Sequence, residues 1–404
     1  MTVYFYLCGI MQLMFSFTKT KKNKVGIVID FAGSSIGGLL FETKEGEKMR
    51  MLISFRKPVN FLFETDFNAS LRCAGESLRF VIKELKKFYP REIDFVVCVF
   101  SSPWFVSHAK TIIVTAEKPF EVKNEFFNNL IEEEEKKLSK NRKINSNFIE
   151  HEVMKADLNG YGVQNPIGKI ANSVKSSIYV SAGVKKAMEK VKEEVEKSFN
   201  HASLSFATFP LVAFKVLGDI IDKKEEGFLI IDIGGEVTDI CIVRNGALEQ
   251  TVSFSIGYNL LIKKISSRMN TFFGESVSIL KAYLREHLAI DELDKTTLAV
   301  SDSVKEWGDG FRKALSEISG ESLLPQSALL MGDDLICKPF YSYVDSKDFS
   351  EFTIIRKPFI AKKIEQAWLK QYFDVADSFH YENNTMLTMG AVYAGVFLKN
   401  LKLK

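Results

Sequence analysis

Residues 228–243, FLIIDIGGEVTDICIV, form an apolar run that ends in an aspartate, a turn of small residues and a second apolar run. Residues 25–38, VGIVIDFAGSSIGG, follow the same order. Each stretch is typical of two β-strands joined by a tight turn, because apolar runs bounded by small residues are strand signals. The two stretches lie half a chain apart, which indicates two related domains that face each other.

The small residues of these turns point to a phosphate site. Successive backbone N–H groups can converge on one point where side chains are small, and this arrangement holds phosphate oxygens. An aspartate at the end of each strand would then lie beside the phosphates and hold water on Mg²⁺, which keeps several waters in protein sites. A single such hairpin is explained equally well as an ordinary β-turn. The paired hairpins instead predict a site that includes Asp30, Gly33, Ser34, Ser35, Asp232, Gly234 and Gly235, with Asp30 and Asp232 holding magnesium through water.

Composition describes a folded protein and removes several function classes. The chain has 404 residues, of which 46% are hydrophobic, and a formal net charge of +3. This length favours two domains or one large bilobed body. So small an excess of positive charge argues against a nucleic-acid partner. The five cysteines and five histidines are scattered, so neither a cysteine metal site nor a histidine metal site is expected.

Periodicity outlines the remaining elements. Residues 95–100 are a continuous apolar run, as in a buried parallel strand. The pattern predicts further strands at 148–153, 173–180 and 328–332, and helices at 78–88, 120–140, 184–199, 258–288, 304–318 and 390–401. The acidic and basic run from Glu132 to Lys137 is read as the solvated face of its helix.

These motifs resemble those of the actin-like ATPases, and within them the FtsA and PilM families. Asp30 to Gly38 is similar to the first phosphate motif of that superfamily, and Asp232 to Asp239, with Thr238 and Asp239, to the second. Residues 329–334 resemble the adenosine motif, and Gly332 within it is expected to contact the nucleotide. Residues 209–214 and 388–395 resemble the two connecting helices. Residues 150–168 look like the small FtsA-type subdomain that is absent from actin itself.

The resemblance implies an α/β fold with two actin-like (ribonuclease H-like) domains facing a nucleotide cleft, and a small FtsA-type subdomain inserted in the first domain. The first domain is expected at 25–109 and 173–215, the inserted subdomain at 110–172, and the second domain at 216–404. A closing helix at 390–401 is expected to return toward the first domain. Residues 1–24 would be an N-terminal lead-in, which is either close to the membrane or the product of a misassigned start.

The sequence departs from the superfamily pattern in both motifs of the second domain. Glu236 and Val237 replace a glycine and a threonine in the second phosphate turn. Asp333 and Asp334 stand where two glycines let the backbone approach adenosine, and their charges would repel a polyanion. No residue that orients an attacking water is identified. ATP and Mg²⁺ are therefore the expected cofactors, with at most weak ATP hydrolysis.

The resemblance implies a scaffold function. An FtsA-like protein would bind ATP, self-associate and link a cell-division assembly to the inner face of the cell membrane, with a tubulin-like division protein as partner. A PilM-like protein would instead be a cytoplasmic platform of type IV pilus assembly that binds pilus inner-membrane proteins. A small-molecule kinase of the same superfamily and a nucleotide-free binding module are further alternatives. The expected location is the cytoplasm, peripheral to the membrane, and residues 148–168 are the expected partner surface.

Overall fold

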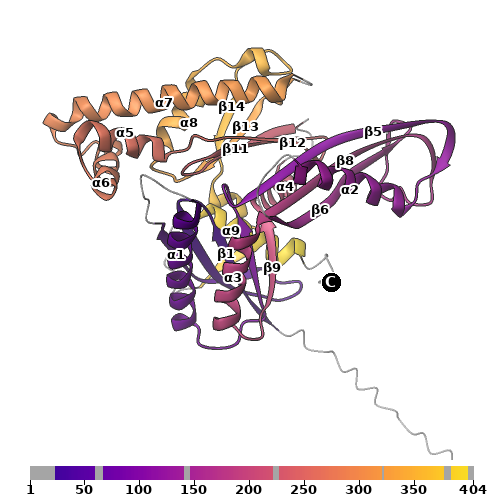
Figure 1. Cartoon of the computed structure of the whole chain (residues 1–404), viewed down its shortest axis with the longest axis horizontal. Helices are drawn as coiled ribbons and strands as arrows, with labels where there is room; N and C mark the ends of the chain where they lie inside the picture. The colour runs from indigo at the N-terminus through magenta and orange to yellow at the C-terminus, as the bar shows by residue number, and fades with distance from the viewer. Residues whose placement is uncertain are drawn as a thin grey trace, which may run out of the picture.

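The computed structural model describes residues 23–59, 67–140, 146–221, 227–320, 323–376 and 384–398. The lead-in expected at 1–24 lies outside the described residues except for its last two positions. The end of the helix expected at 390–401 lies outside them as well. Two lobes, an inserted sheet and two helices between the lobes make up the described molecule (Figure 1).

The first lobe is built on a six-stranded sheet with the order β15-β3-β2-β1-β4-β9. The apolar run at 95–100 is confirmed as a buried parallel strand, because β4 lies parallel to both β1 and β9. Helices α1 (Phe67–Phe88) and α3 (Lys185–Ser198) bury their apolar faces against one side of this sheet. The strands are β1 (Lys24–Phe31), β2 (Ser35–Thr43), β3 (Met49–Pro58), β4 (Phe95–Phe100), β9 (Ser203–Thr208) and β15 (Phe373–Val375).

The second lobe repeats this plan with a five-stranded sheet in the order β12-β11-β10-β13-β14. Its outer face is covered by helices packed around Trp307, which is fully buried. The strands are β10 (Gly227–Ile233), β11 (Thr238–Arg244), β12 (Ala247–Phe254), β13 (Ser327–Gly332) and β14 (Ile360–Lys363), and the helices are α5 (Asn259–Met269), α6 (Phe273–Leu284), α7 (Ile290–Ser319) and α8 (Lys338–Ser346).

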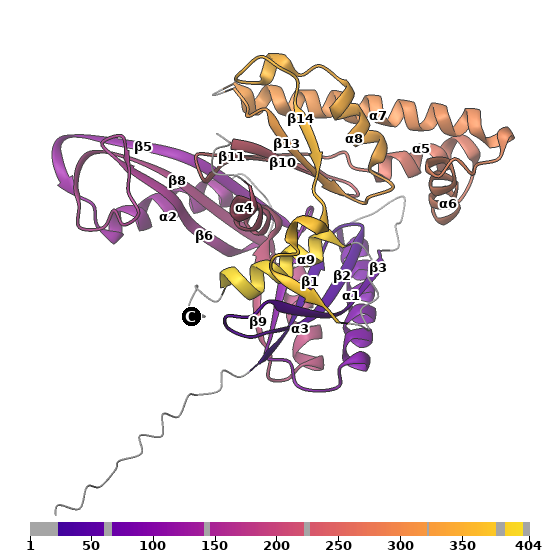
Figure 2. The ribbon, with the colours of Figure 1, turned by 180° about the vertical axis from the view of Figure 1, so that it is seen from behind.

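Two helices lie between the sheets of the lobes (Figure 2). They are α4 (Phe209–Ile220) and α9 (Thr385–Val392), and α9 continues as one π-helical turn, Tyr393–Phe397. All but one of the residues from Phe209 to Leu217 of α4 are buried, which fits the continuous apolar sequence of this part of the helix. A single hydrophobic core therefore runs from β1 and β4 through these helices to β10 and β13.

A separate four-stranded antiparallel sheet, in the order β5-β8-β6-β7, extends from the body and is packed against α2 (Figure 1). Its two longest strands reach beyond the range 110–172, because β5 begins at Phe105 and β8 ends at Val184. Their inner ends are buried, and Ser107 of β5 lies 3.4 Å from Thr251 of β12. The elements are β5 (Phe105–Glu121), α2 (Asn124–Lys140), β6 (Ser146–Leu158), β7 (Tyr161–Gly162) and β8 (Ile170–Val184).

The stretch expected to be mostly helical, 258–288, contains two helices, α5 and α6. The break falls at Asn270, which adopts a left-handed conformation with φ of 54° and ends α5. Helix α7 begins fourteen residues earlier than the expected 304, at Ile290. Short 3₁₀ turns at Ser350–Phe352 and Gln366–Leu369 complete the assignment. Within the described ranges, no helix combines the length and apolar composition that a membrane crossing requires.

Candidate functional site

The two hairpins recognised in the sequence occupy equivalent positions in the two sheets. Strand β1 pairs with β2 so that Asp30 lies opposite Gly37, and β10 pairs with β11 so that Asp232 lies opposite Asp239. Each first strand also lies parallel to a neighbour, β4 in the first lobe and β13 in the second. The turns and the ends of these parallel strands meet at one edge, which is where ligands bind in open α/β sheets.

A cleft of about 560 Å³ lies at this meeting point and is lined by both hairpins. Every predicted site residue except Thr238 lines it, so the structure brings together residues that are half a chain apart. The lining residues from the prediction are Asp30, Gly33, Ser34, Ser35, Asp232, Gly234, Gly235, Asp239 and Gly332.

Thr238 faces the interior of the second lobe. Its hydroxyl donates to the carbonyl oxygen of Ile256 at 2.7 Å and accepts from Nε1 of Trp307 at 2.9 Å. The side chain is completely buried. We therefore correct its assignment from the cleft to the packing of the second sheet against α7.

The two lobes touch directly across the cleft. The hydroxyl of Tyr258 donates to Oγ of Ser34 at 2.6 Å, and Oγ of Ser102 donates to the carboxylate of Asp239 at 3.0 Å. A Cβ atom at Gly235 would lie 2.6 Å from Cβ of Ser34, closer than real contacts allow. A glycine is therefore required at this position for the two turns to approach each other.

Asp30, Asp232 and Asp239 are the aspartates of the two hairpins that line the cleft. Burial raises the pKa of Asp232 well above its usual range, and the negative charges of Asp239 and Asp30 raise it further. A bound cation would lower the free energy of the ionised state. Hard oxygen donors of this kind suit Mg²⁺.

These carboxylates do not form a closed metal site. Within the described part of the chain, no three histidine, cysteine or acidic side chains converge on one point as a closed metal site. An ion at Asp30 and Asp232 would therefore keep water or phosphate oxygens as its remaining ligands, as Mg²⁺ usually does.

The departure at Glu236 does not place a charge in the cleft. Its carboxylate accepts from Nδ2 of Asn259 at 2.9 Å and from Nζ of Lys263 at 2.8 Å, both on α5. The backbone N–H of Asn259 also donates to the carbonyl of Gly235 at 2.9 Å. Glu236 therefore braces the second phosphate turn against α5. Val237, in contrast, lines the cleft with an apolar side chain.

Asp333 and Asp334, in the turn expected to meet adenosine, line the cleft, and both carboxylates have partners. Asp333 accepts from the backbone N–H groups of Leu335 and Ile336 at 3.0 and 2.8 Å. Asp334 forms an ion pair of 2.9 Å with Lys363 of β14. These contacts reduce the repulsion expected from the sequence. Gly332 before them has φ of 149°, and a Cβ there would lie 2.7 Å from Sγ of Cys337, so the turn requires glycine.

Several cleft residues were not identified from the sequence. Ser101 and Ser102 follow the buried strand β4, and that position at the end of a parallel strand is a signal that could have found them. The others carry no local signal, because they come from strands, loops and helices far from either motif. They are Arg56, Tyr258, Lys281, Arg285 and Asn384.

Comparison with known proteins agrees with this architecture. No family model matches the chain. Cell division protein FtsA of Neisseria meningitidis serogroup B is 28% identical over 156 residues, which are 38% of this chain and 36% of that protein. The chain thus matches about a third of this relative's length.

Among solved structures, a chain of the PilM-PilN type IV pilus biogenesis complex superposes with a TM-score of 0.63 and 14% identity, covering 92% of this chain and 98% of that one. So low an identity establishes likeness of fold alone. The chain therefore shares the fold of that PilM-PilN complex chain, and 38% of its length is similar in sequence to FtsA.

Proposed function

We propose that this chain binds ATP with Mg²⁺ between its lobes and uses the bound nucleotide to set the arrangement of the lobes. The observation that carries the proposal is the single cleft lined by Asp30, Asp232 and the adenosine turn at Gly332. Asp30 and Asp232 would order the water shell of the ion. Small residues in both turns would leave the backbone N–H groups accessible to the phosphates.

We further propose that the nucleotide-bound form is an assembly scaffold, as the FtsA relative suggests. In this role the chain would self-associate and join a division assembly, with a tubulin-like protein as partner, to the inner face of the cell membrane. The likeness in fold to a chain of the PilM-PilN complex supports the alternative, a platform in type IV pilus assembly that binds pilus inner-membrane proteins.

Nucleotide binding is tested by titrating purified full-length chain with a fluorescent ATP analogue in the presence and absence of Mg²⁺. We expect saturable binding that Mg²⁺ strengthens and that Asp232→Ala weakens by tenfold or more. Absence of binding to the wild-type chain would overturn the proposal and would favour a nucleotide-free binding module.

The scaffold role has its own test. Sedimentation with ATP and Mg²⁺ should show nucleotide-dependent assembly, and flotation with anionic liposomes should show membrane association. Two results together would contradict this role. The chain would remain monomeric with and without nucleotide, and it would bind neither a tubulin-like division protein nor pilus inner-membrane proteins encoded beside it.

A further inference from the structure

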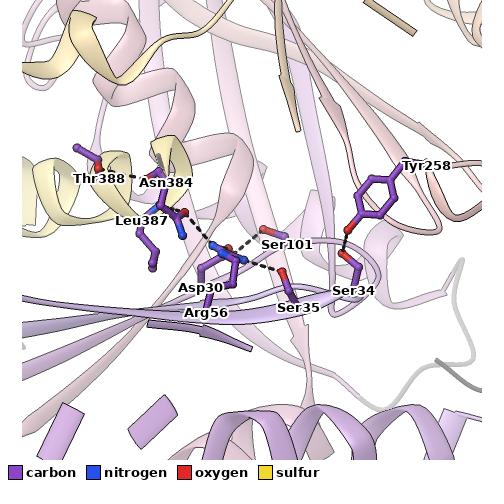
Figure 3. A network of polar contacts seen from close by, with 9 residues as sticks. All are labelled: Asp30, Ser34, Ser35, Arg56, Ser101, Tyr258, Asn384, Leu387 and Thr388. Carbon is purple, nitrogen blue, oxygen red and sulfur yellow. Dashed lines mark hydrogen bonds and ion pairs between the residues drawn. The ribbon is translucent and has the colours of Figure 1, made fainter. Parts of the chain in front are cut away.

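Arg56 places a positive charge beside the first phosphate turn. It lies on β3, outside both sequence motifs, and its guanidinium lines the cleft. Nη1 donates to Oγ of Ser35 at 2.7 Å, and Nη2 donates to Oδ2 of Asp30 at 2.6 Å and to Oδ1 of Asn384 at 2.9 Å (Figure 3). The side chain of Asp30 is 4% exposed and that of Arg56 is 25% exposed. Both side chains line the cleft, but the guanidinium is the more exposed of the two.

The backbone of β2 is shaped to admit this guanidinium. A Cβ atom at Gly37 would lie 2.7 Å from Nη2 of Arg56 and 2.9 Å from its Cζ. Any residue other than glycine at this position would therefore push Arg56 out of its place over the strand. Gly37 also pairs with Asp30 in the hairpin, so the space lies directly beside that carboxylate.

Two of the hydrogen-bond partners of Arg56, Ser35 and Asp30, are residues expected to bind the nucleotide and its ion. Ser35 belongs to the turn expected to meet phosphate, and Asp30 is expected to hold water on Mg²⁺. A guanidinium within hydrogen-bonding distance of Ser35 is close enough to reach a phosphate oxygen that this turn binds, and arginine pairs strongly with phosphate. The guanidinium occupies one hydrogen-bonding position of Oδ2 of Asp30. A metal-bound water could donate a hydrogen bond at that position only after Arg56 has left it.

We propose that Arg56 is a phosphate-binding residue that exchanges Asp30 for the phosphate groups when a nucleotide enters the cleft. This inference rests on the nucleotide binding proposed above. In the empty cleft Arg56 neutralises the buried carboxylate of Asp30. In the filled cleft its guanidinium meets the phosphate chain, and Asp30 becomes available to the water shell of the ion.

The exchange also reaches helix α9. Oδ1 of Asn384 accepts from Arg56 and, at 3.3 Å, from the backbone N–H of Leu387, so this side chain both caps α9 and holds the arginine (Figure 3). A guanidinium near a helix N-terminus is electrostatically unfavourable, since that end carries partial positive charge. When Arg56 moves to phosphate, the side-chain oxygen of Asn384 keeps only its hydrogen bond to Leu387. Nucleotide binding therefore changes the contacts of the first turn of α9.

The test compares triphosphate with monophosphate binding. A fluorescent ATP analogue is titrated with Mg²⁺ into wild type, Arg56→Gln, Arg56→Lys and the matched control Arg312→Gln, which removes an arginine from an exposed ion pair with Glu351 in the second lobe. AMP is measured by competition. We expect Arg56→Gln to weaken the ATP analogue by about tenfold to a hundredfold and AMP by less than threefold, with partial rescue in Arg56→Lys and no change in Arg312→Gln.

A purely structural role would give a different pattern. If Arg56 only stabilises Asp30, its loss loosens the turn and weakens ATP and AMP equally, and that result overturns the proposal. Unchanged ATP affinity in Arg56→Gln overturns it as well. Arg56→Lys keeps the positive charge beside Asp30, so it decides the question if the glutamine variant fails to fold: a loss of affinity in this variant that is equal for ATP and AMP would overturn the inference.

Hydrogen exchange tests the link to α9. Addition of ATP and Mg²⁺ should change the exchange of the peptide containing Leu387 in wild type, and this change should be absent in Arg56→Gln. The same change in both proteins would contradict the link. Failure of the wild type to bind nucleotide would defeat the proposed function itself, whereas wild-type binding that is insensitive to Arg56 defeats only this inference.

Discussion

The hydroxyl of Thr238 illustrates how one side chain can belong to a motif and yet serve packing. It bonds both Ile256 and the indole of Trp307 inside the second lobe. Replacement by valine leaves the Trp307 N–H buried without an acceptor. We expect Thr238→Val to lower the free energy of unfolding by about 1–3 kcal/mol, measured by chemical denaturation, with nucleotide affinity unchanged.

Thr238→Ser is the matched control for that change, because it keeps the hydroxyl and removes one methyl group. It should retain most of the stability that valine loses. A loss of nucleotide affinity in Thr238→Val without loss of stability would contradict the packing role. It would show that Thr238 contributes to nucleotide binding.

The negative charge of Asp232 is expected to destabilise the empty chain and to favour nucleotide binding with Mg²⁺. Its raised pKa means that ionisation in the empty cleft opposes folding, so its contribution to stability is largest below the pKa of an exposed aspartate and is lost as pH rises. Asp232→Asn should therefore raise the melting temperature of the nucleotide-free chain at pH 7.5 and should weaken Mg²⁺-dependent nucleotide binding. Asp219→Asn, on the exposed end of α4, provides a control that lacks this buried charge. A lower melting temperature in Asp232→Asn would show that the carboxylate stabilises the empty chain.

Glu150 of β6 connects the inserted sheet to the start of α4. Its carboxylate accepts from Oγ of Ser181 at 2.5 Å and from the backbone N–H of Thr208 at 2.9 Å, where α4 begins. Burial raises the pKa of Glu150 to about 7. The hydrogen bonds from Ser181 and Thr208 oppose this shift without cancelling it.

The pH dependence of stability should report this contact. An ordinary glutamate loses its proton near pH 4.5 in the unfolded chain, whereas Glu150 keeps its proton to about pH 7 in the folded chain. Stability should therefore fall as pH rises from about 4.5 to 7, by at most about 3 kcal/mol, and then level off.

Glu150→Gln should flatten this slope in denaturant unfolding between pH 5 and 8, and Glu196→Gln, an exposed change on α3, should leave it intact. If the slope of unfolding free energy against pH is the same in Glu150→Gln as in wild type, other groups cause the pH dependence.

Elements differ in how far the sequence could predict them. The hairpins and β4 are continuous apolar runs that end in small residues, so their signal is local and their placement followed from it. Strand β5 alternates buried and exposed positions irregularly over 17 residues, because one face is covered by α2 and much of the other is open. Its pattern therefore gave neither its length nor its start.

The candidate site shows the same contrast. The turn residues of both hairpins could be predicted because small residues after an aspartate form a short motif. The contact between Arg56 and Asn384 joins residues 328 positions apart, and no local pattern relates them. Only the return of α9 to the first sheet brings them together. Thr238 was misassigned because a motif gives the order of side chains along a strand but not the partner that each one finds.

The contact between Tyr258 and Ser34 joins the two lobes directly. Tyr258→Phe removes this hydrogen bond while keeping the ring. We expect the free energy of unfolding to fall by about 1 kcal/mol and the dissociation of a bound nucleotide analogue, measured by stopped-flow fluorescence, to become several-fold faster. The exposed Tyr161 supplies the control Tyr161→Phe, which should alter neither quantity. Slower dissociation in Tyr258→Phe would mean that the contact holds the lobes in an arrangement that opposes binding.

The first sheet is completed by the last part of the described chain. Strand β15 adds beside β3 through bonds such as the Met49 N–H to the Tyr372 carbonyl at 3.0 Å, and α9 packs on β1 and β2. During translation, β3 therefore remains an open edge, and the apolar surface beneath α9 stays exposed, while more than three hundred further residues are made. The nascent first lobe must wait for the second lobe to be synthesised before it can finish folding.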